Sequence, residues 1–183
     1  MPDRVVGLVL AAGEGCRFGM PKALARSADG TPWCARAVDT LVAGGCEDVV
    51  VVLGAMGEAA LHLVPPRAEV VLARDWAEGT AASLRAGLRA TDASVALVTL
   101  VDLPGLVPEA VARVLARSGE ATVARATYAG RPGHPVAIGR RHWDAFTGDR
   151  RPGEVLAGLG AVEVDCTALG GGDDVDHSLV ALG

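Results

Sequence analysis

The sequence predicts an α/β fold, in which helices cover both faces of a mostly parallel sheet. Short runs of β-branched residues alternate with longer stretches rich in Ala, Leu and Arg. Several of the short runs are apolar throughout, which is typical of strands covered on both faces. This alternating order favours an open three-layer α/β/α sandwich. At 183 residues the chain has the length of one domain, and we expect residues 1–183 to form it.

The strands are expected where valine and leucine gather in runs of three to seven residues. Valine is favoured in strands because its branched side chain packs well on a pleated surface. In chain order, the expected strands are Val5–Leu10, Asp48–Leu53, Glu69–Leu72, Val95–Val101, Ala121–Ala126 and Val162–Val164.

The helices are expected in the longer stretches between these strands, where alanine and leucine recur with arginine. Pro108 suits the first position of its helix, Glu109 the first turn and Arg117 the last. Residues 130–135 (GRPGHP) predict a loop or short hairpin across the mouth of the sheet, and residues 170–174 (GGGDD) a flexible turn. The expected helices are Trp33–Ala43, Gly57–Leu63, Thr80–Ala90, Pro108–Arg117 and Arg151–Leu159.

Composition excludes several classes of function. The net charge of −5 argues against a nucleic-acid partner, because phosphate backbones need a basic surface. The apolar runs are far shorter than the ~18–20 residues of a membrane span, and the start lacks a signal-peptide cleavage pattern. The four cysteines are scattered without C-x-x-C spacing, so we expect reduced thiols, no zinc and a cytoplasmic protein. They are Cys16, Cys34, Cys46 and Cys166.

The stretch AAGEGCRFGMPK, residues 11–22, follows the first expected strand and carries the strongest chemical signal. Ligands of open α/β sheets bind beyond the carboxyl ends of the strands, where this stretch lies. Its three glycines leave backbone N–H groups free to cradle a phosphate. Arg17 and Lys22, the only lysine of the chain, bring positive charge to the same turn. The stretch therefore predicts a phosphate-binding loop.

Two common phosphate loops fit this stretch poorly. A dinucleotide-binding G-x-G-x-x-G turn would place the third glycine one position earlier than Gly19 and would run straight into a helix. The G-x-x-x-x-G-K-[ST] pattern fails because Met20 and Pro21 separate Gly19 from the lysine. An ordinary tight turn with two solvated charges is the remaining alternative.

Asp102 ends the apolar strand VALVTLV, residues 95–101. A carboxylate at the tip of a buried strand is costly without a partner. Mg²⁺ prefers oxygen ligands and accompanies phosphates, so we expect it there. The alternative is that Asp102 caps the helix that follows the prolines at 104 and 108.

The residues Leu10 to Lys22 read L-A-A-G-x-G-x-R-x-G-x-P-K. This pattern resembles the signature loop of the MobA-like NTP transferase family, and within it that of the molybdenum cofactor cytidylyltransferases. The resemblance implies a Rossmann-like sheet of the nucleotide-diphospho-sugar transferase type. It implies nucleotide-binding roles for Leu10, Ala11, Ala12, Gly13, Gly15, Arg17 and Lys22, with Arg17, Lys22 and Asp102 as the catalytic residues.

Three further segments resemble those of the family. WAEGTAASLRAGL, residues 76–88, is similar to the segment that borders the nucleotide base, through Gly79 and Ser83; small residues for close helix packing are the alternative. GRPGHPV, residues 130–136, resembles the segment that faces the acceptor. It implies acceptor contacts for Gly133, His134 and Pro135, and we expect His134 to line the substrate or fix the loop.

DDVDHSLVAL, residues 173–182, keeps Asp174 and Asp176 of the family's D-[IV]-D-T-P-E-D segment. Asp176 would be the second metal ligand, opposite Asp102; a solvated acidic turn is the alternative. The chain departs from the family at 177–180. It also departs at 148–153, where GDRRPG replaces G-D-x-G-A-R. These departures concern the acceptor more than the nucleotide.

The resemblance implies a Mg²⁺-dependent nucleotidyltransferase that moves a nucleoside monophosphate from an NTP to a phosphorylated acceptor, molybdopterin, and releases pyrophosphate. Ala12 stands where the guanylyl branch has glycine, and its methyl group would narrow the base pocket, which favours CTP over GTP. A molybdoenzyme or chaperone partner stays open. The alternatives are a guanylyltransferase and a non-catalytic nucleotide-binding protein.

A nicotinamide-dependent dehydrogenase is the rival enzyme class. It would need an acidic residue at the end of the second strand to bind the ribose. That strand ends VVVVLGAMG, residues 49–57, without an acid, so the sequence disfavours this class.

Overall fold

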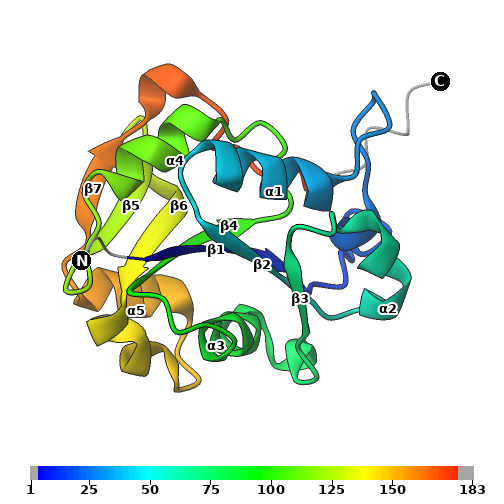
Figure 1. Ribbon diagram of the computed structural model, residues 1–183, viewed down its shortest axis with the longest axis horizontal. Coiled ribbons are helices and arrows are strands. Elements are labelled where there is room, and N and C mark those ends of the chain that lie inside the picture. The colour runs from blue at the N-terminus through cyan, green and yellow to red at the C-terminus, as the bar shows by residue number, and fades with distance from the viewer. Residues whose placement is uncertain (1–3, 177–183) are drawn as a thin grey trace.

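The computed structural model describes residues 4–176 and contains a seven-stranded sheet with helices on both faces (Figure 1). The strand order is β3-β2-β1-β4-β6-β5-β7. β6 is antiparallel to both of its neighbours, whereas every other pair is parallel. The three-layer α/β prediction is thereby confirmed. The strands are β1 (Val5–Ala11), β2 (Asp48–Leu53), β3 (Glu69–Leu72), β4 (Val95–Leu100), β5 (Val123–Tyr128), β6 (Arg131–Gly139) and β7 (Val162–Asp165).

The helices divide between the two faces of the sheet. α1 and α4 cover one face, and α3 and α5 cover the other (Figure 1). All of them begin and end within two residues of the expected bounds, and the helix expected at 57–63 is split into an α-helical and a 3₁₀ turn. The α-helices are α1 (Trp33–Ala43), α2 (Gly57–Ala60), α3 (Thr80–Arg89), α4 (Pro108–Leu115) and α5 (Pro152–Gly158). The 3₁₀ turns are η1 (Lys22–Leu24), η2 (Leu61–Leu63), η3 (Trp76–Glu78), η4 (Arg140–Phe146) and η5 (Thr167–Leu169).

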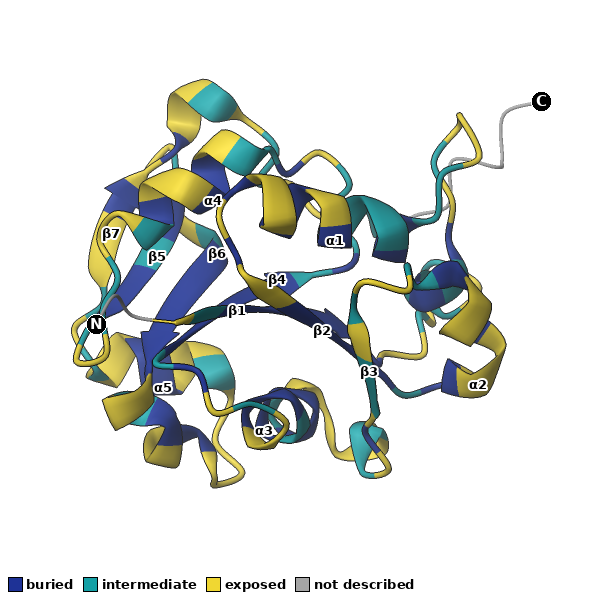
Figure 2. Ribbon diagram, in the orientation of Figure 1, coloured by how far each residue is buried: buried dark blue, intermediate teal, exposed yellow. Residues whose placement is uncertain are grey.

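Two apolar clusters sandwich the sheet, one on each face. Val9 and Leu97 belong to the cluster under α1 and α4, and Leu8 and Ile138 to the cluster over α3 and α5. The central strands are consequently dark along their length in Figure 2. Successive residues of a strand point to opposite faces of the sheet. Because both faces are buried, both sets of side chains are apolar, which explains the unbroken apolar runs in the sequence. Within residues 4–176, helices long and apolar enough to cross a membrane are absent.

The loop or short hairpin expected at 130–135 is partly correct: Gly130 lies in the turn of the β5–β6 hairpin, but residues 131–135 begin β6, a nine-residue strand inside the sheet. Its prolines suggested a loop because proline cannot donate to a ladder. In the structure both prolines precede Val136, the first residue of β6 that pairs with β4. Pro132 and Pro135 therefore lie outside the ladder of hydrogen bonds between β4 and β6. The turn from β5 to β6 passes through Ala129 and Gly130, both at positive φ.

Candidate active site

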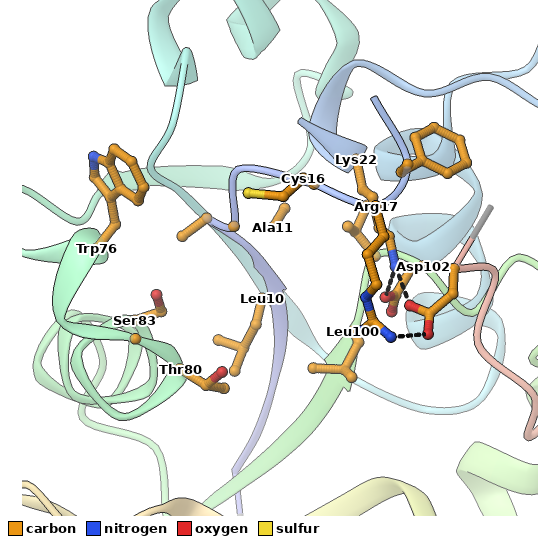
Figure 3. A pocket seen from close by; sticks show the side chains of 17 residues that line it. Leu10, Ala11, Cys16, Arg17, Lys22, Trp76, Thr80, Ser83, Leu100 and Asp102 are labelled. Carbon is orange, nitrogen blue, oxygen red and sulfur yellow. Dashed lines mark hydrogen bonds and ion pairs between the residues drawn. The ribbon is translucent and has the colours of Figure 1, made fainter. Parts of the chain in front are cut away.

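The residues that the sequence predicted for nucleotide, metal and catalysis line a single cavity of about 400 Å³ (Figure 3). The cavity opens where β1 and β4, which are parallel neighbours, end at the same edge of the sheet. This is the edge at which α/β folds bind ligands. The predicted residues that meet there are Leu10, Ala11, Ala12, Gly13, Gly15, Arg17, Lys22, Gly79, Ser83, Asp102 and Asp176.

The glycine-rich loop owes its shape to Gly15. The N–H groups of Phe18 and Gly19 both donate to the Gly15 carbonyl at 2.9 Å, which closes a tight turn. Gly15 has φ +64°, and a Cβ there would overlap the carbonyl oxygen of Met20. A side chain is therefore excluded at this position by both conformation and space. The 3₁₀ turn η1 follows this loop, and its first residue is Lys22.

Lys22 forms the centre of an ion network at the cavity wall (Figure 3). Its Nζ lies 2.6 Å from Asp102 Oδ2 and 3.2 Å from Asp176 Oδ1. Arg17 Nη1 lies 2.8 Å from the other oxygen of Asp176. Burial acts to lower the Lys22 pKa, but the hydrogen bonds and charges of Asp102 and Asp176 outweigh it, so the pKa is raised. Lys22 is therefore charged at neutral pH.

The carboxylates of this network suit a divalent cation. One oxygen from each of Asp102, Asp174 and Asp176 lies within 4.8 Å of the others. Asp102 Oδ1 is buried and has no hydrogen-bond partner within residues 4–176, and such an oxygen is a ligand that Mg²⁺ accepts. The alternative that Asp102 caps a helix is wrong, because α4 begins at Pro108 with Val107 at its N-cap. Residues 177–180 lie outside the described residues.

The far wall of the cavity comes from η3 and α3. Gly79, at φ +108°, turns the chain into α3, and Ser83 is buried one turn later. Ala12 packs closely on the next strand: a Cβ at Gly54 would lie 2.7 Å from the Ala12 methyl carbon. Sequence reasoning missed six lining residues. Trp76 could have been noticed, because it is one of three tryptophans and is the first residue of the segment 76–88 that contains Gly79. The six are Cys16, Phe18, Trp76, Thr80, Leu100 and Val101.

A second cavity, of about 620 Å³, adjoins the first. Of the three residues predicted to contact the acceptor, Gly133 and His134 line it, whereas Pro135 is buried in the sheet and does not. His134 Nδ1 lies 3.3 Å from the Val98 carbonyl oxygen, so Nδ1 carries the proton that it donates. Burial lowers the His134 pKa, and the ring is neutral at pH 7. The two cavities share Leu10, Gly79, Thr80 and Leu100.

Comparison with known proteins agrees with this geometry. The model of the MobA-like NTP transferase domain matches residues 7–162. A curated relative, the nicotine blue oxidoreductase of Paenarthrobacter nicotinovorans, is 37% identical over 151 residues, which covers 73% of this chain and 70% of the relative.

Among solved structures, Rv0371c of Mycobacterium tuberculosis H37Rv superimposes with a TM-score of 0.81 and 24% identity, over 97% of this chain and 95% of that one. The same protein has also been solved in complex with manganese. A nucleotidyl transferase from Methanothermobacter (Mth528) gives a TM-score of 0.78 and 22% identity, over 95% of this chain and 92% of that one. These two likenesses show the fold.

Proposed function

The chain belongs to the MobA-like NTP transferase family, and from that premise we propose that it transfers CMP from CTP to a phosphorylated acceptor, molybdopterin, with release of pyrophosphate. The chain is a nucleotidyltransferase, as its membership of this family shows. One observation carries the proposal: two cations and three carboxylates meet at the edge of a cavity that shares four lining residues with a second one. We take residues 1–183 to act as one domain.

In this proposal Arg17 and Lys22 bind the triphosphate of the nucleotide. The two charges would stabilise the negative charge that develops as the pyrophosphate departs. An oxygen of the acceptor phosphate forms a bond to the α-phosphorus, and the bond between that phosphorus and the bridging oxygen of the pyrophosphate breaks. The acceptor phosphate is already ionised at neutral pH, because its second pKa is about 6. A general base is therefore not required.

Asp102 and Asp176 would hold the Mg²⁺, with Asp174 beside them. The orphaned oxygen of Asp102 and the spacing of the three carboxylates support this assignment. The bound ion would lower the repulsion between the nucleotide phosphates and the incoming phosphate. Rv0371c, which has this fold, was solved with manganese.

The preference for CTP rests on Ala12, which lines the cavity and, like Trp76, lies close to Gly54, where we expect the base to bind. A purine would need more room there than a pyrimidine. One methyl group discriminates by only about 1–3 kcal/mol, so GTP is the alternative substrate.

The test is Mg²⁺-dependent release of pyrophosphate from CTP, GTP, UTP and ATP in the presence of molybdopterin. We expect release with CTP and a smaller rate with GTP. A parallel thermal-shift panel should show the same order, since a nucleotide at 100 times its Kd adds about 2.7 kcal/mol of stability. No release with any nucleotide, together with a thermal shift, would leave a non-catalytic nucleotide-binding protein.

A second candidate is favoured by the name of the curated relative, which is an oxidoreductase. In that case the first cavity would hold a redox cofactor and the second an aromatic substrate. The end of β2 disfavours binding of a nicotinamide dinucleotide. Leu53 is followed by Gly54 and Ala55, so no acidic side chain is present there to bind the ribose. Oxidation of NADH or NADPH by the protein with nicotine blue, unchanged in Lys22→Ala, would favour this candidate over nucleotidyl transfer.

A further inference from the structure

Arg125 is a charged residue with apolar neighbours on its face of the sheet. It lies in the middle of β5, directly opposite Val136 of β6, and its side chain is 18% exposed. The neighbours of β5 on this face, Val123 and Val136, belong to the apolar cluster over α3 and α5. Arg125 also lines the second cavity. Burying an arginine here without a purpose would be costly.

The internal partner of Arg125 satisfies only part of its guanidinium. Nη2 donates to Oε1 of Glu163 at 3.0 Å, from the directly opposite position on β7. Nε is buried and has no hydrogen-bond partner within residues 4–176. A buried donor without an acceptor costs about 1–3 kcal/mol, and such groups call for an explanation. Glu163 does not line the cavity, so the guanidinium stands between a carboxylate on one side and the cavity on the other.

One wall of the cavity suits a flat apolar body, whereas Glu78, Asp149 and Arg151 add charged groups to its lining. Its walls include Leu84, Val98, Ile138, Phe146 and Leu156. Such a wall binds an aromatic ring through buried area, and one charged group then fixes the orientation of the ligand. Arg125 is the most enclosed cation of this cavity, because Arg151, the other arginine on its lining, is exposed.

Arg125 is too far from the carboxylates to hold the phosphate that reacts. It lies two strand spacings from β4, level with Val98, which precedes Asp102 by four residues. With 4.8 Å between strands and 3.3 Å per residue, the two Cα atoms are roughly 16 Å apart. An anion on Arg125 is therefore a second anionic group of the acceptor.

We propose that Arg125 is the anion-recognising residue of the second cavity, and that the acceptor combines a flat apolar body with a carboxylate or other oxyanion that binds this guanidinium. The proposal rests on the proposed nucleotidyl transfer, from which it takes the second cavity as the acceptor site. Where it holds, the acceptor is not a molybdopterin whose reacting phosphate is its only oxyanion. Glu163 holds the guanidinium in place and competes with the ligand for it.

The test compares two probes of equal size, naphthalene-2-carboxylate and naphthalene-2-carboxamide, by calorimetry on the nucleotide-free protein. We expect the wild type to bind the carboxylate about tenfold more tightly, which corresponds to about 1.4 kcal/mol. Arg125→Gln should bind both probes equally, and Arg125→Lys should keep part of the preference. Glu163→Gln should bind the carboxylate more tightly than the wild type, because it frees the guanidinium.

Arg151→Gln is the matched control from the rim of the same cavity, and it should keep the preference. The proposal would be overturned by equal binding of the two probes by the wild type, by no binding of either, or by loss of the preference in Arg151→Gln alone. If the Arg125–Glu163 pair is merely structural, both variants lower the Tm and neither changes the preference, which also overturns it. The assay needs neither nucleotide nor turnover, so a failed transferase assay and a failed binding assay are distinguishable.

Discussion

At the residue scale, the Lys22 ammonium has two proposed partners, the carboxylates of Asp102 and Asp176 and the phosphates of the nucleotide, and it cannot bind both fully at once. Without ligand its ammonium neutralises Asp102 and Asp176. These are the carboxylates that we assign to the metal, and Lys22 is the cation that we assign to the phosphates. A divalent ion on the carboxylates would therefore compete with Lys22, and would free it for the nucleotide. Metal and nucleotide are then expected to strengthen each other's binding.

Lys22→Met tests this exchange. The variant keeps the length of the side chain and removes its charge, so Asp102 and Asp176 lose a competing cation. We expect the nucleotide-free variant to bind Mn²⁺ more tightly than the wild type, and CTP more weakly. Calorimetry with each ligand alone measures both effects. Equal or weaker Mn²⁺ binding would contradict the exchange.

Lys22→Arg is the companion variant. It keeps the positive charge, so its Mn²⁺ affinity should stay close to that of the wild type. The guanidinium is wider than the ammonium and approaches phosphate oxygens with a different geometry. We therefore expect a substantial fall in kcat for pyrophosphate release. Wild-type turnover in this variant would show that charge alone is needed at position 22.

At the element scale, Gly13 and Gly15 of the glycine-rich loop have different structural roles. Gly15 has a positive φ, and its missing side chain leaves room for the Met20 carbonyl. Gly13 has a negative φ and open space around its Cα. The loop therefore depends on Gly15 for its conformation, whereas Gly13 leaves its backbone accessible from the cavity.

Gly15→Ala should distort the loop, and Gly13→Ala should not. In the first variant a methyl group meets backbone, and the residue is also held at a φ that alanine disfavours. We expect Gly15→Ala to lose about 1–3 kcal/mol of stability and most of its CTP affinity. Gly13→Ala should keep the wild-type Tm. Chemical denaturation and calorimetry compare the two, and equal stability would refute the distinction.

The buried elements of the fold could be predicted because both faces of the sheet are covered. The runs at 48–53 and 69–72 match β2 and β3, and 33–43 matches α1, residue for residue. β6 was missed because its first half carries two prolines and a glycine, and local sequence does not show that these residues avoid the ladder to β4. Which residues of β6 enter that ladder is decided by its pairing with β4, a strand that is distant in the sequence.

The candidate site was predictable where its residues form a motif, or where a lone carboxylate ends a buried strand, as Asp102 does. The loop from Leu10 to Lys22 could be found because its glycines and cations are consecutive in sequence. Arg125 could not be found in the same way, since it is a single residue of β5 and only the folded sheet brings it to a cavity. Thr99 and Trp33 have buried side-chain atoms without partners within residues 4–176, and nothing in the structure explains them.

At the scale of the whole molecule, β6 divides the sheet into two working halves. β1 and β4 end at the first cavity, and β6 and β5 line the second. His134 of β6 forms hydrogen bonds with both halves. Its ring bonds to the Val98 carbonyl of β4, and the Tyr128 hydroxyl of β5 donates to the backbone carbonyl of His134 at 2.9 Å. Protonating this ring would place a charge between the halves.

The pH dependence of stability should report this ring. Burial lowers the His134 pKa in the folded chain, whereas in the unfolded chain it is about 6.5. The unfolded state therefore takes up the proton first, and the stability that the neutral ring provides above pH 6.5 is lost as the pH falls through the folded value. Thermal melts from pH 7.5 to 5 should fall less steeply for His134→Gln than for the wild type, with His62→Gln, at an exposed position, as the control for losing a histidine. A wild-type slope in His134→Gln would mean that the folded and unfolded chains bind this proton equally.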